Sequence, residues 1–143
     1  MIPPQFPTPK TIGTKDPSKP YNDRLAVRVV AFNAAGQVAI LYAQRDNYYK
    51  LPGGGIDPDE DHATAVHREF AEETGGLIQL RDGGCVATTL EFRGDLRQVS
   101  YCYCADLVDG SGKPCLTEDE IGDRLGHLWV AVEPRGQEAD GCG

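Results

Sequence analysis

LPGGGIDPDEDHATAVHREFAEETGG, residues 51–76, is the stretch that decides the fold of this chain. Asp61 is a favoured residue type at the start of a helix, and Gly75 can end one in the left-handed conformation. The apolar residues between them recur at the spacing of one helix face: Ala63, Val66 and Phe70. The stretch therefore predicts a helix over residues 62–74, about three and a half turns long.

Three glutamates crowd one side of this predicted helix: Glu69, Glu72 and Glu73. At about 100° per residue they lie together, roughly opposite Ala63 and Phe70. Like charges at this spacing repel unless cations neutralise them, and carboxylate oxygens are ligands that Mg²⁺ or Mn²⁺ prefers. A solvated surface face is the alternative interpretation of such a cluster. The preceding glycines favour metal binding, because they let the backbone approach phosphate closely: Gly53, Gly54 and Gly55.

The glycines, Glu60 and the REFAEETG run together resemble the Nudix box, the signature of the Nudix hydrolase family. The resemblance implies cleavage of a nucleoside diphosphate linked to a moiety X, with divalent ions that polarise the diphosphate and activate water. It also implies an α/β fold, an α/β/α sandwich around a mixed sheet. One position departs from the family pattern, because Gly76 stands where the last residue of the box is usually aliphatic.

The same resemblance implies a role for each residue of the box. The metal ligands would be Glu69, Glu72, Glu73 and the backbone carbonyl of Gly53. Glu73 is also a candidate for activating water, Arg68 would orient the carboxylates, and Glu60 is the leading glutamate. Catalysis is therefore expected to depend on Glu73, Glu72, Arg68 and Glu60, with Mg²⁺ or Mn²⁺ as cofactor.

The run YYKLPGGGID looks like a MutT-like branch of the family that acts on nucleoside triphosphates, including oxidised purine forms. We therefore predict a Mg²⁺-dependent pyrophosphohydrolase acting on a nucleoside triphosphate. ADP-ribose, a nucleotide sugar, a dinucleotide or an isoprenoid diphosphate is an alternative substrate, because the box reads only the diphosphate and its metal. A module that senses a nucleotide without cleaving it is the alternative from another class.

The amino-acid composition indicates which binding partners and which cellular compartment to expect. The net charge is −8 and there is no basic run, so polymeric nucleic acid is not expected, whereas a small anionic nucleotide with its metal is. Five cysteines without CxxC spacing argue against a zinc site or a disulfide framework, and they indicate a reducing, cytoplasmic location. No apolar run approaches the length of a membrane span.

The 143 residues form one expected domain with two tails. Residues 1–23 are a proline-rich arm that cannot form a regular helix or a central strand, and residues 24–132 are the Nudix domain. Residues 133–143 are expected to be a flexible tail, in place of the C-terminal helix that the family packs on its sheet. A second subunit could cover the sheet face left bare, which would make a homodimer.

Alternating and β-branched runs predict the strands of this domain, at residues 25–32, 38–43, 77–80, 86–92, 98–107 and 127–132. The fourth and fifth form an antiparallel pair. Tyr101 and Tyr103 share one face of the fifth strand. They could stack on a nucleobase or pack in the core, and core packing is the favoured interpretation.

Further substrate contacts are expected just before the glycines, from Arg45, Tyr48, Tyr49 and Lys50, together with Gly54 and Gly55. The two tyrosines could instead cover the sheet edge. Glu120 and Glu91 are candidates for an extra base or metal ligand beyond the box. Thr117 and Glu120 form a capping box at the start of a short helix reaching about residue 125, so we favour a structural role for Glu120.

Overall fold

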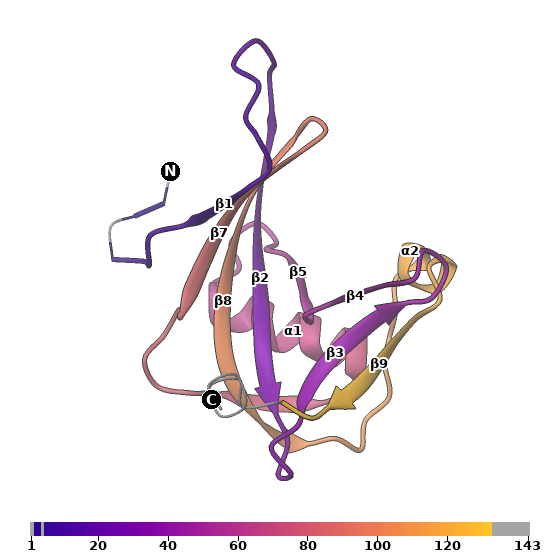
Figure 1. Cartoon of the computed structure of the whole chain (residues 1–143). Coiled ribbons are helices and arrows are strands. Elements are labelled where there is room, and N and C mark those ends of the chain that lie inside the picture. Colours follow the sequence, from indigo (N-terminus) through magenta and orange to yellow (C-terminus); the bar gives the residue numbers. More distant parts are fainter. Residues whose placement is uncertain (1, 4, 133–143) are drawn as a thin grey trace, which may run out of the picture.

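The computed structural model describes residues 2, 3 and 5–132 of the chain, and within them a mixed nine-stranded sheet is covered on one face by a helix (Figure 1). The elements in chain order are β1 (Lys10–Ile12), β2 (Asn22–Phe32), β3 (Val38–Ala43), β4 (Tyr48–Lys50), β5 (Gly53–Gly55), α1 (His62–Thr74), β6 (Leu77–Leu80), β7 (Ala87–Arg93), β8 (Leu96–Asp109), α2 (Glu118–Gly122) and β9 (Leu125–Val130). The α/β class and the mixed sheet are confirmed.

Helix α1 begins and ends where the sequence predicts. The Asp61 carboxylate accepts a hydrogen bond from Thr64 N at 2.7 Å, and Gly75 adopts a left-handed φ of 80° while its N–H bonds Ala71 O. These caps satisfy backbone groups that the helix itself leaves free. The capping signals are therefore sufficient to fix both ends of α1.

The buried face of α1 differs from the predicted one. Ala63 is exposed, and the buried residues include Ala65 and Val66 beside Phe70. Glu73 is buried too, at 2% exposure. Three residues of helix turn the side chain by about 300°, so Glu73 lies only about 60° from Phe70. The prediction that all three glutamates lie opposite Phe70 was wrong for Glu73.

Two long parallel strands, β2 and β8, form the centre of the sheet, in register from Asn22↔Leu96 to Phe32↔Asp106. β8 pairs antiparallel with β7, as predicted, and with β6 further along. The other edge of β2 changes neighbour: Ala26 to Arg28 pair with β5, whereas Phe32 pairs with Val38 of β3. β5 therefore lies along β2 beside α1, which contacts both strands.

The proline-rich arm follows the edge of the sheet. β1 is a three-residue strand parallel to β7, and Phe6 packs on Tyr101 with ring centroids 4.8 Å apart. The described residues among 2–21 form neither a helix nor a central strand, as predicted. Asn22 and Asp23, which the prediction assigns to the arm, already belong to the central strand β2.

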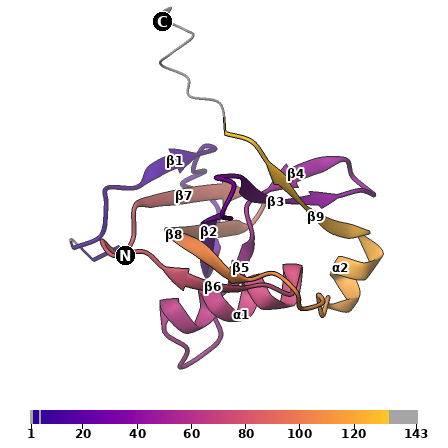
Figure 2. The same cartoon turned by 90° about the horizontal axis from the view of Figure 1, so that it is seen from below.

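The core lies between α1 and the sheet (Figure 2). Tyr101 and Tyr103 are both buried there, and the Tyr103 hydroxyl lies 2.6 Å from His62 Nδ1. Trp129 of β9 packs edge-on against Phe70 from the other end. The core-packing interpretation of the two β8 tyrosines is therefore confirmed.

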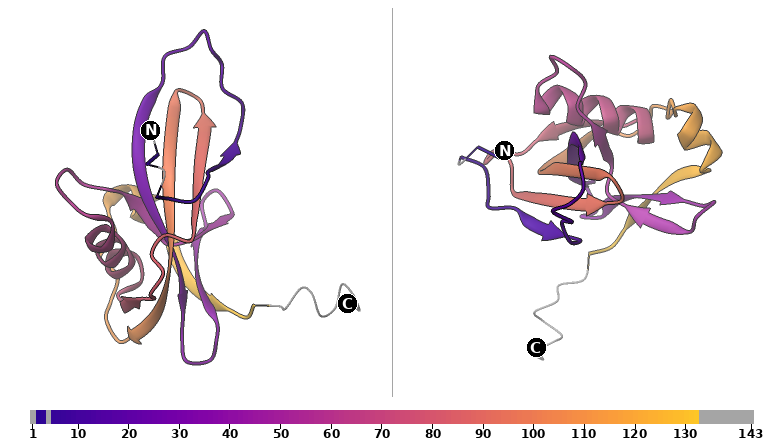
Figure 3. Two further views of the ribbon diagram at one scale, coloured as in Figure 1. Left: turned by 90° about the vertical axis from the view of Figure 1, so that its left-hand side faces the viewer. Right: turned by 90° about the horizontal axis from the view of Figure 1, so that it is seen from above.

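In edge-on view α1 lies on one side of the sheet, and no helix of residues 2, 3 and 5–132 covers the opposite side (Figure 3). α2 ends at Gly122, earlier than predicted, because Arg124 takes a positive φ of 53° and β9 begins at Leu125. The predicted flexible tail and missing helix fall on residues 133–143, outside the described residues. Neither described helix is long and apolar enough to cross a membrane.

Candidate functional site

A cleft of about 1260 Å³ opens beside β5, where α1, α2 and the central strands come together. Its volume is larger than that of many small-molecule sites, which is about 300–1,000 Å³, and it has room for a nucleotide. The lining is unusually charged. Its charged residues are Asp23, Arg24, Arg28, Lys50, Asp57, Asp59, Glu60, Arg68, Glu69, Glu72, Glu73, Glu91, Arg93 and Glu120.

The glycines of β5 bring backbone and carboxylates together in this cleft. Gly53 has a φ of 149°, and a side chain there would clash with the carbonyl of Val27 on β2. A Cβ on Gly54 would lie 2.5 Å from Glu69 Oε2. Both positions need glycine because the strand is in contact with β2 and with α1 at once. The close approach lets Gly53 N donate a hydrogen bond to Glu73 Oε1 at 2.9 Å.

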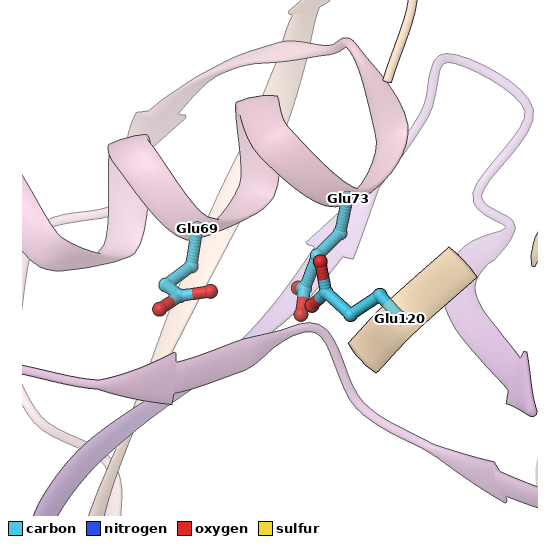
Figure 4. A group of neighbouring side chains, drawn as sticks. All are labelled: Glu69, Glu73 and Glu120. Carbon is cyan, nitrogen blue, oxygen red and sulfur yellow. The ribbon is translucent and has the colours of Figure 1, made fainter. Parts of the chain in front are cut away.

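Three carboxylates converge at the C-terminal half of α1: Glu69, Glu73 and Glu120 (Figure 4). Each offers an oxygen, and these oxygens all lie within 4.8 Å of one another. We call this group the acidic cluster. Glu120 comes from α2, and its side chain also completes the predicted capping box by accepting from Thr117 N at 2.9 Å. The capping role and the position in the cluster are thus compatible.

The acidic cluster holds three carboxylates, and of these Glu69 has a guanidinium beside it, that of Arg68 at 3.1 Å. Burial, together with repulsion from the nearby Glu69 and Glu120, raises the pKa of Glu73 to about 8, against the lowering effect of the Gly53 N–H and Lys50. Burial also raises the pKa of Glu69. A hard divalent cation would relieve this repulsion, and three carboxylates with a glycine backbone beside them are a fitting donor set for Mg²⁺ or Mn²⁺.

Arg68 organises the other half of the box. Its guanidinium bonds both oxygens of Glu60 at 2.6 and 2.8 Å and the carbonyl of Gly55 at 3.1 Å. It also lies 3.1 Å from Glu69 and 3.4 Å from Glu72. The pairing lowers the pKa of Glu60 to about 2 and raises that of Arg68. Arg68 thus ties the middle of α1 to β5 and to the loop that follows it.

The role of Glu72 as a metal ligand stays a prediction. It lines the cleft, but its carboxylate pairs with Arg68 and is not among the converging oxygens. Glu120 takes the third place beside Glu69 and Glu73. The reason is the helical turn: Glu72 lies away from β5, whereas α2 approaches on the side of Glu73.

The other predicted site residues divide into three groups. Those lining the cleft are Tyr48, Lys50, Gly53, Gly54, Gly55 and Glu91. Arg45 and Tyr49 are not part of the lining, because Arg45 pairs with Asp123 at 2.7 Å and Tyr49 stacks on Tyr42. Tyr101 and Tyr103 are in the core on the α1 side of the sheet, so neither is placed to stack on a base.

Sequence reasoning missed the arginines of β2. Arg24 and Arg28 both line the cleft on β2, next to β5. One signal was available, because Arg28 is the only polar residue in the otherwise apolar run LAVRVVAF. A charge inside such a run needs a partner or an exposed surface. The strand order that places it beside the glycines was not available.

Comparisons with known proteins show which relatives this chain is similar to. The chain is 40% identical over 80 residues to an RNA pyrophosphohydrolase of Pseudomonas fluorescens (strain SBW25), an alignment covering 54% of this chain and 46% of that relative. The chain thus spans about half the length of the curated relatives it matches.

Solved structures share the fold. A MutT protein from Methanosarcina mazei Go1 matches with a TM-score of 0.59 and 20% identity over 81% of this chain and 80% of its own. The Ap4A hydrolase of C. elegans matches with a TM-score of 0.59 and 19% identity, over 81% of this chain and 86% of its own. A NUDIX domain model matches residues 22–136, most of the sequence, and the chain therefore belongs to the NUDIX domain family.

Proposed function

We propose that this chain is a divalent-metal-dependent hydrolase that cleaves a diphosphate bond in a nucleotide, with a nucleoside triphosphate as its substrate. The observation that carries the proposal is the convergence of Glu69, Glu73 and Glu120 within 4.8 Å beside the Gly53 backbone. Such a group is costly unless a cation occupies it, so it is poorly explained as mere surface.

Each residue has a separate task in this proposal. Glu69, Glu73 and Glu120 would hold Mg²⁺ or Mn²⁺, which supplies charge to polarise the diphosphate and to activate water. Glu73 is the carboxylate best placed to take a proton from that water, because it is buried and held at Oε1 by Gly53 N. Arg68 keeps α1 and the glycine strand in fixed relation through Glu60 and Gly55.

The cleft residues outside the acidic cluster would determine which moiety X is bound. A triphosphorylated 5′ end of RNA is a second candidate substrate, favoured by the 40% identity to a protein named RNA pyrophosphohydrolase. The net charge of −8 favours a small nucleotide over a polymer, since a polyanion gains little from an acidic protein. ADP-ribose, nucleotide sugars, dinucleotides and isoprenoid diphosphates complete the panel to be tested.

A nucleotide sensor that does not cleave its ligand is the alternative from another class. A sensor needs affinity for the ligand but no group to accept a proton from water. The position of Glu73 favours an enzyme, because this carboxylate is buried in the acidic cluster and held at Oε1 by Gly53 N, as general-base catalysis requires of a positioned group.

The test is release of phosphate or pyrophosphate from this panel, with Mg²⁺, with Mn²⁺ and in chelator. We expect metal-dependent turnover that falls at least about a hundredfold in Glu73→Gln. Tight nucleotide binding without turnover of any panel member would favour the sensor. Full activity in chelator would contradict the metal dependence.

A further inference from the structure

Two arginines on β2 face the cleft without a carboxylate partner. Arg24 and Arg28 are four residues apart on one strand, so their side chains share one face of the sheet. Within residues 2, 3 and 5–132, neither lies within ion-pair distance of an acidic group. We call them the arginine pair. In a chain with a net charge of −8 and an acidic cleft, two such unpaired guanidinium groups need an explanation.

The other arginines of the same cleft are paired. Arg68 contacts four carboxylates, and Arg93 bonds Glu91 at 2.8 Å. Among the described residues Arg28 instead donates only to the backbone carbonyl of Leu51, at 3.3 Å, and burial lowers its pKa. A partly buried guanidinium with free donors is a good site for a phosphate, whose oxygens match its planar fork.

A buried amide fixes the position of Arg24. The Gln98 side chain is 2% exposed, its Oε1 accepts from Arg24 Nη1 at 2.6 Å, and its Nε2 donates to Ser100 Oγ at 3.2 Å. Gly55 leaves room on the other side, since a Cβ there would lie 3.0 Å from Arg24 Nη2. Because glutamine is neutral, it holds the guanidinium in place and leaves its positive charge for another group.

The arginine pair and the acidic cluster lie on either side of the β5 glycines. β5 pairs with β2 from Ala26 to Arg28, which places Gly53 opposite Arg28, and Gly53 N reaches Glu73. A diphosphate bound with metal at the acidic cluster would therefore have the arginine pair across the glycine strand. Phosphate beyond that diphosphate would meet positive charge there, whereas a sugar would leave two cations without a partner.

We infer that Arg24 and Arg28 bind a further phosphate group, which makes a chain of at least three phosphates the preferred substrate class. Gln98 is the positioning residue for Arg24. The inference rests on the proposed diphosphate site, and it separates nucleotides with a triphosphate from ADP-ribose and nucleotide sugars. The triphosphate can belong to a free nucleotide or to the 5′ end of an RNA.

The test compares the binding of inorganic tripolyphosphate with that of pyrophosphate. Neither probe carries a moiety X, so the comparison does not depend on the identity of X. Affinities are measured by calorimetry at saturating Mg²⁺ for the wild type and for Arg24→Gln, Arg28→Gln and Gln98→Glu. Arg81→Gln is the matched control, because it removes the same charge from an ion pair outside the cleft lining, where Arg81 pairs with Asp106 at 2.7 Å.

We expect the wild type and Arg81→Gln to bind tripolyphosphate about ten- to a hundredfold more tightly than pyrophosphate, the scale of one or two charged hydrogen bonds. Arg24→Gln and Arg28→Gln should reduce this ratio to near one while pyrophosphate affinity changes little. Gln98→Glu keeps the shape but neutralises Arg24, so it should reduce the ratio with an unchanged melting temperature. A lower melting temperature with the ratio intact would assign Gln98 a structural role only.

Three results would overturn the inference in different ways. Equal binding of the two probes by the wild type contradicts it and leaves the proposed hydrolase untouched. A preference for tripolyphosphate over pyrophosphate that persists in both Arg24→Gln and Arg28→Gln also contradicts the inference and leaves the proposed hydrolase untouched. Failure of the wild type to bind either probe with Mg²⁺ contradicts the proposed diphosphate site as well. The source of the triphosphate is tested by measuring kcat/KM of the wild type and of Arg28→Gln for a nucleoside triphosphate and for a 5′-triphosphorylated RNA. The source is the substrate whose kcat/KM the substitution lowers.

Discussion

Two glutamates at opposite ends of the box, Glu60 just before α1 and Glu73 near the end of α1, are in opposite electrostatic states. Glu60 is neutralised by Arg68 at 2.6 Å, which lowers its pKa to about 2. Glu73 is buried beside two other carboxylates, which raises its pKa to about 8. The box thus holds one carboxylate that is already paired and another that has no ion-pair partner among the described residues.

The difference lies in how each carboxylate can be satisfied. The Arg68 guanidinium is a permanent partner that connects α1 to the loop after β5, so Glu60 contributes to the shape of the site. Within the described residues, Glu73 has no ion-pair partner. The acidic cluster has the Gly53 N–H, the capping bond of Glu120, Arg68 beside Glu69 at 3.1 Å and the charge of Lys50. Its remaining negative charge is available to a bound cation. The structural role of Glu60 and the proposed metal-binding role of the acidic cluster therefore belong to different parts of the box.

The largest expected effect comes from neutralising one glutamate at each end of the box, Glu73 or Glu60. Glu73→Gln should lower turnover at least about a hundredfold, because it removes a cluster ligand and the candidate base. Glu60→Gln should keep turnover within about tenfold and lower the melting temperature by about 3–6 °C, as expected for a loss of about 1 kcal/mol. Single-turnover rates and thermal melts of both variants would measure this. Similar rates for the two variants would remove the distinction.

Glu120 sharpens the comparison, because it serves the cluster and its own helix cap. Glu120→Gln retains an oxygen for the capping bond to Thr117 but loses the charge. We expect turnover to fall about ten- to a hundredfold at nearly constant melting temperature, in contrast to the purely structural role that the capping box favours. Glu118→Gln, in the first turn of the same helix, is the control. Normal turnover at saturating Mg²⁺ would restore the structural interpretation.

The smallest effect is the pH dependence of stability in chelator. The folded pKa of Glu73, about 8, lies above its ordinary value of 4.5, so the folded state binds more protons between these values. The free energy of unfolding should therefore fall as pH rises from about 4.5 to 8. Glu73→Gln should flatten this slope in denaturant titrations. A wild-type stability that rises through the same range would mean that burial does not control this carboxylate.

Local signals predicted the parts of the site that one segment encodes. Asp61 and Gly75 fixed the ends of α1, and the box spacing brought Glu69 and Glu73 onto the part of α1 where the acidic cluster lies. The burial of Glu73 was missed because the apolar face was taken from Ala63 rather than from Ala65 and Val66. Simple counting at about 100° per residue would have placed Glu73 next to Phe70.

Long-range contacts account for the remaining differences. Glu120 reaches the acidic cluster only because α2 precedes β9, which pairs with β3 beside α1. Arg24 and Arg28 reach the cleft only because β5 pairs with β2. Arg45 and Tyr49 are near the glycines in sequence, but their partners Asp123 and Tyr42 hold them outside the cleft. Pairing across the sheet decides these positions, and no local pattern encodes it.

The most direct measurement of the central claim is Mn²⁺ binding, followed by the electron paramagnetic resonance of the free ion, for the wild type, Glu73→Gln and Glu60→Gln. Our account predicts that Glu73→Gln weakens Mn²⁺ binding at least about tenfold, whereas Glu60→Gln binds like the wild type, because Arg68 already neutralises Glu60. Equal weakening by both substitutions, or Mn²⁺ binding that Glu73→Gln leaves unchanged, would contradict the claim that the end of α1 is the metal site.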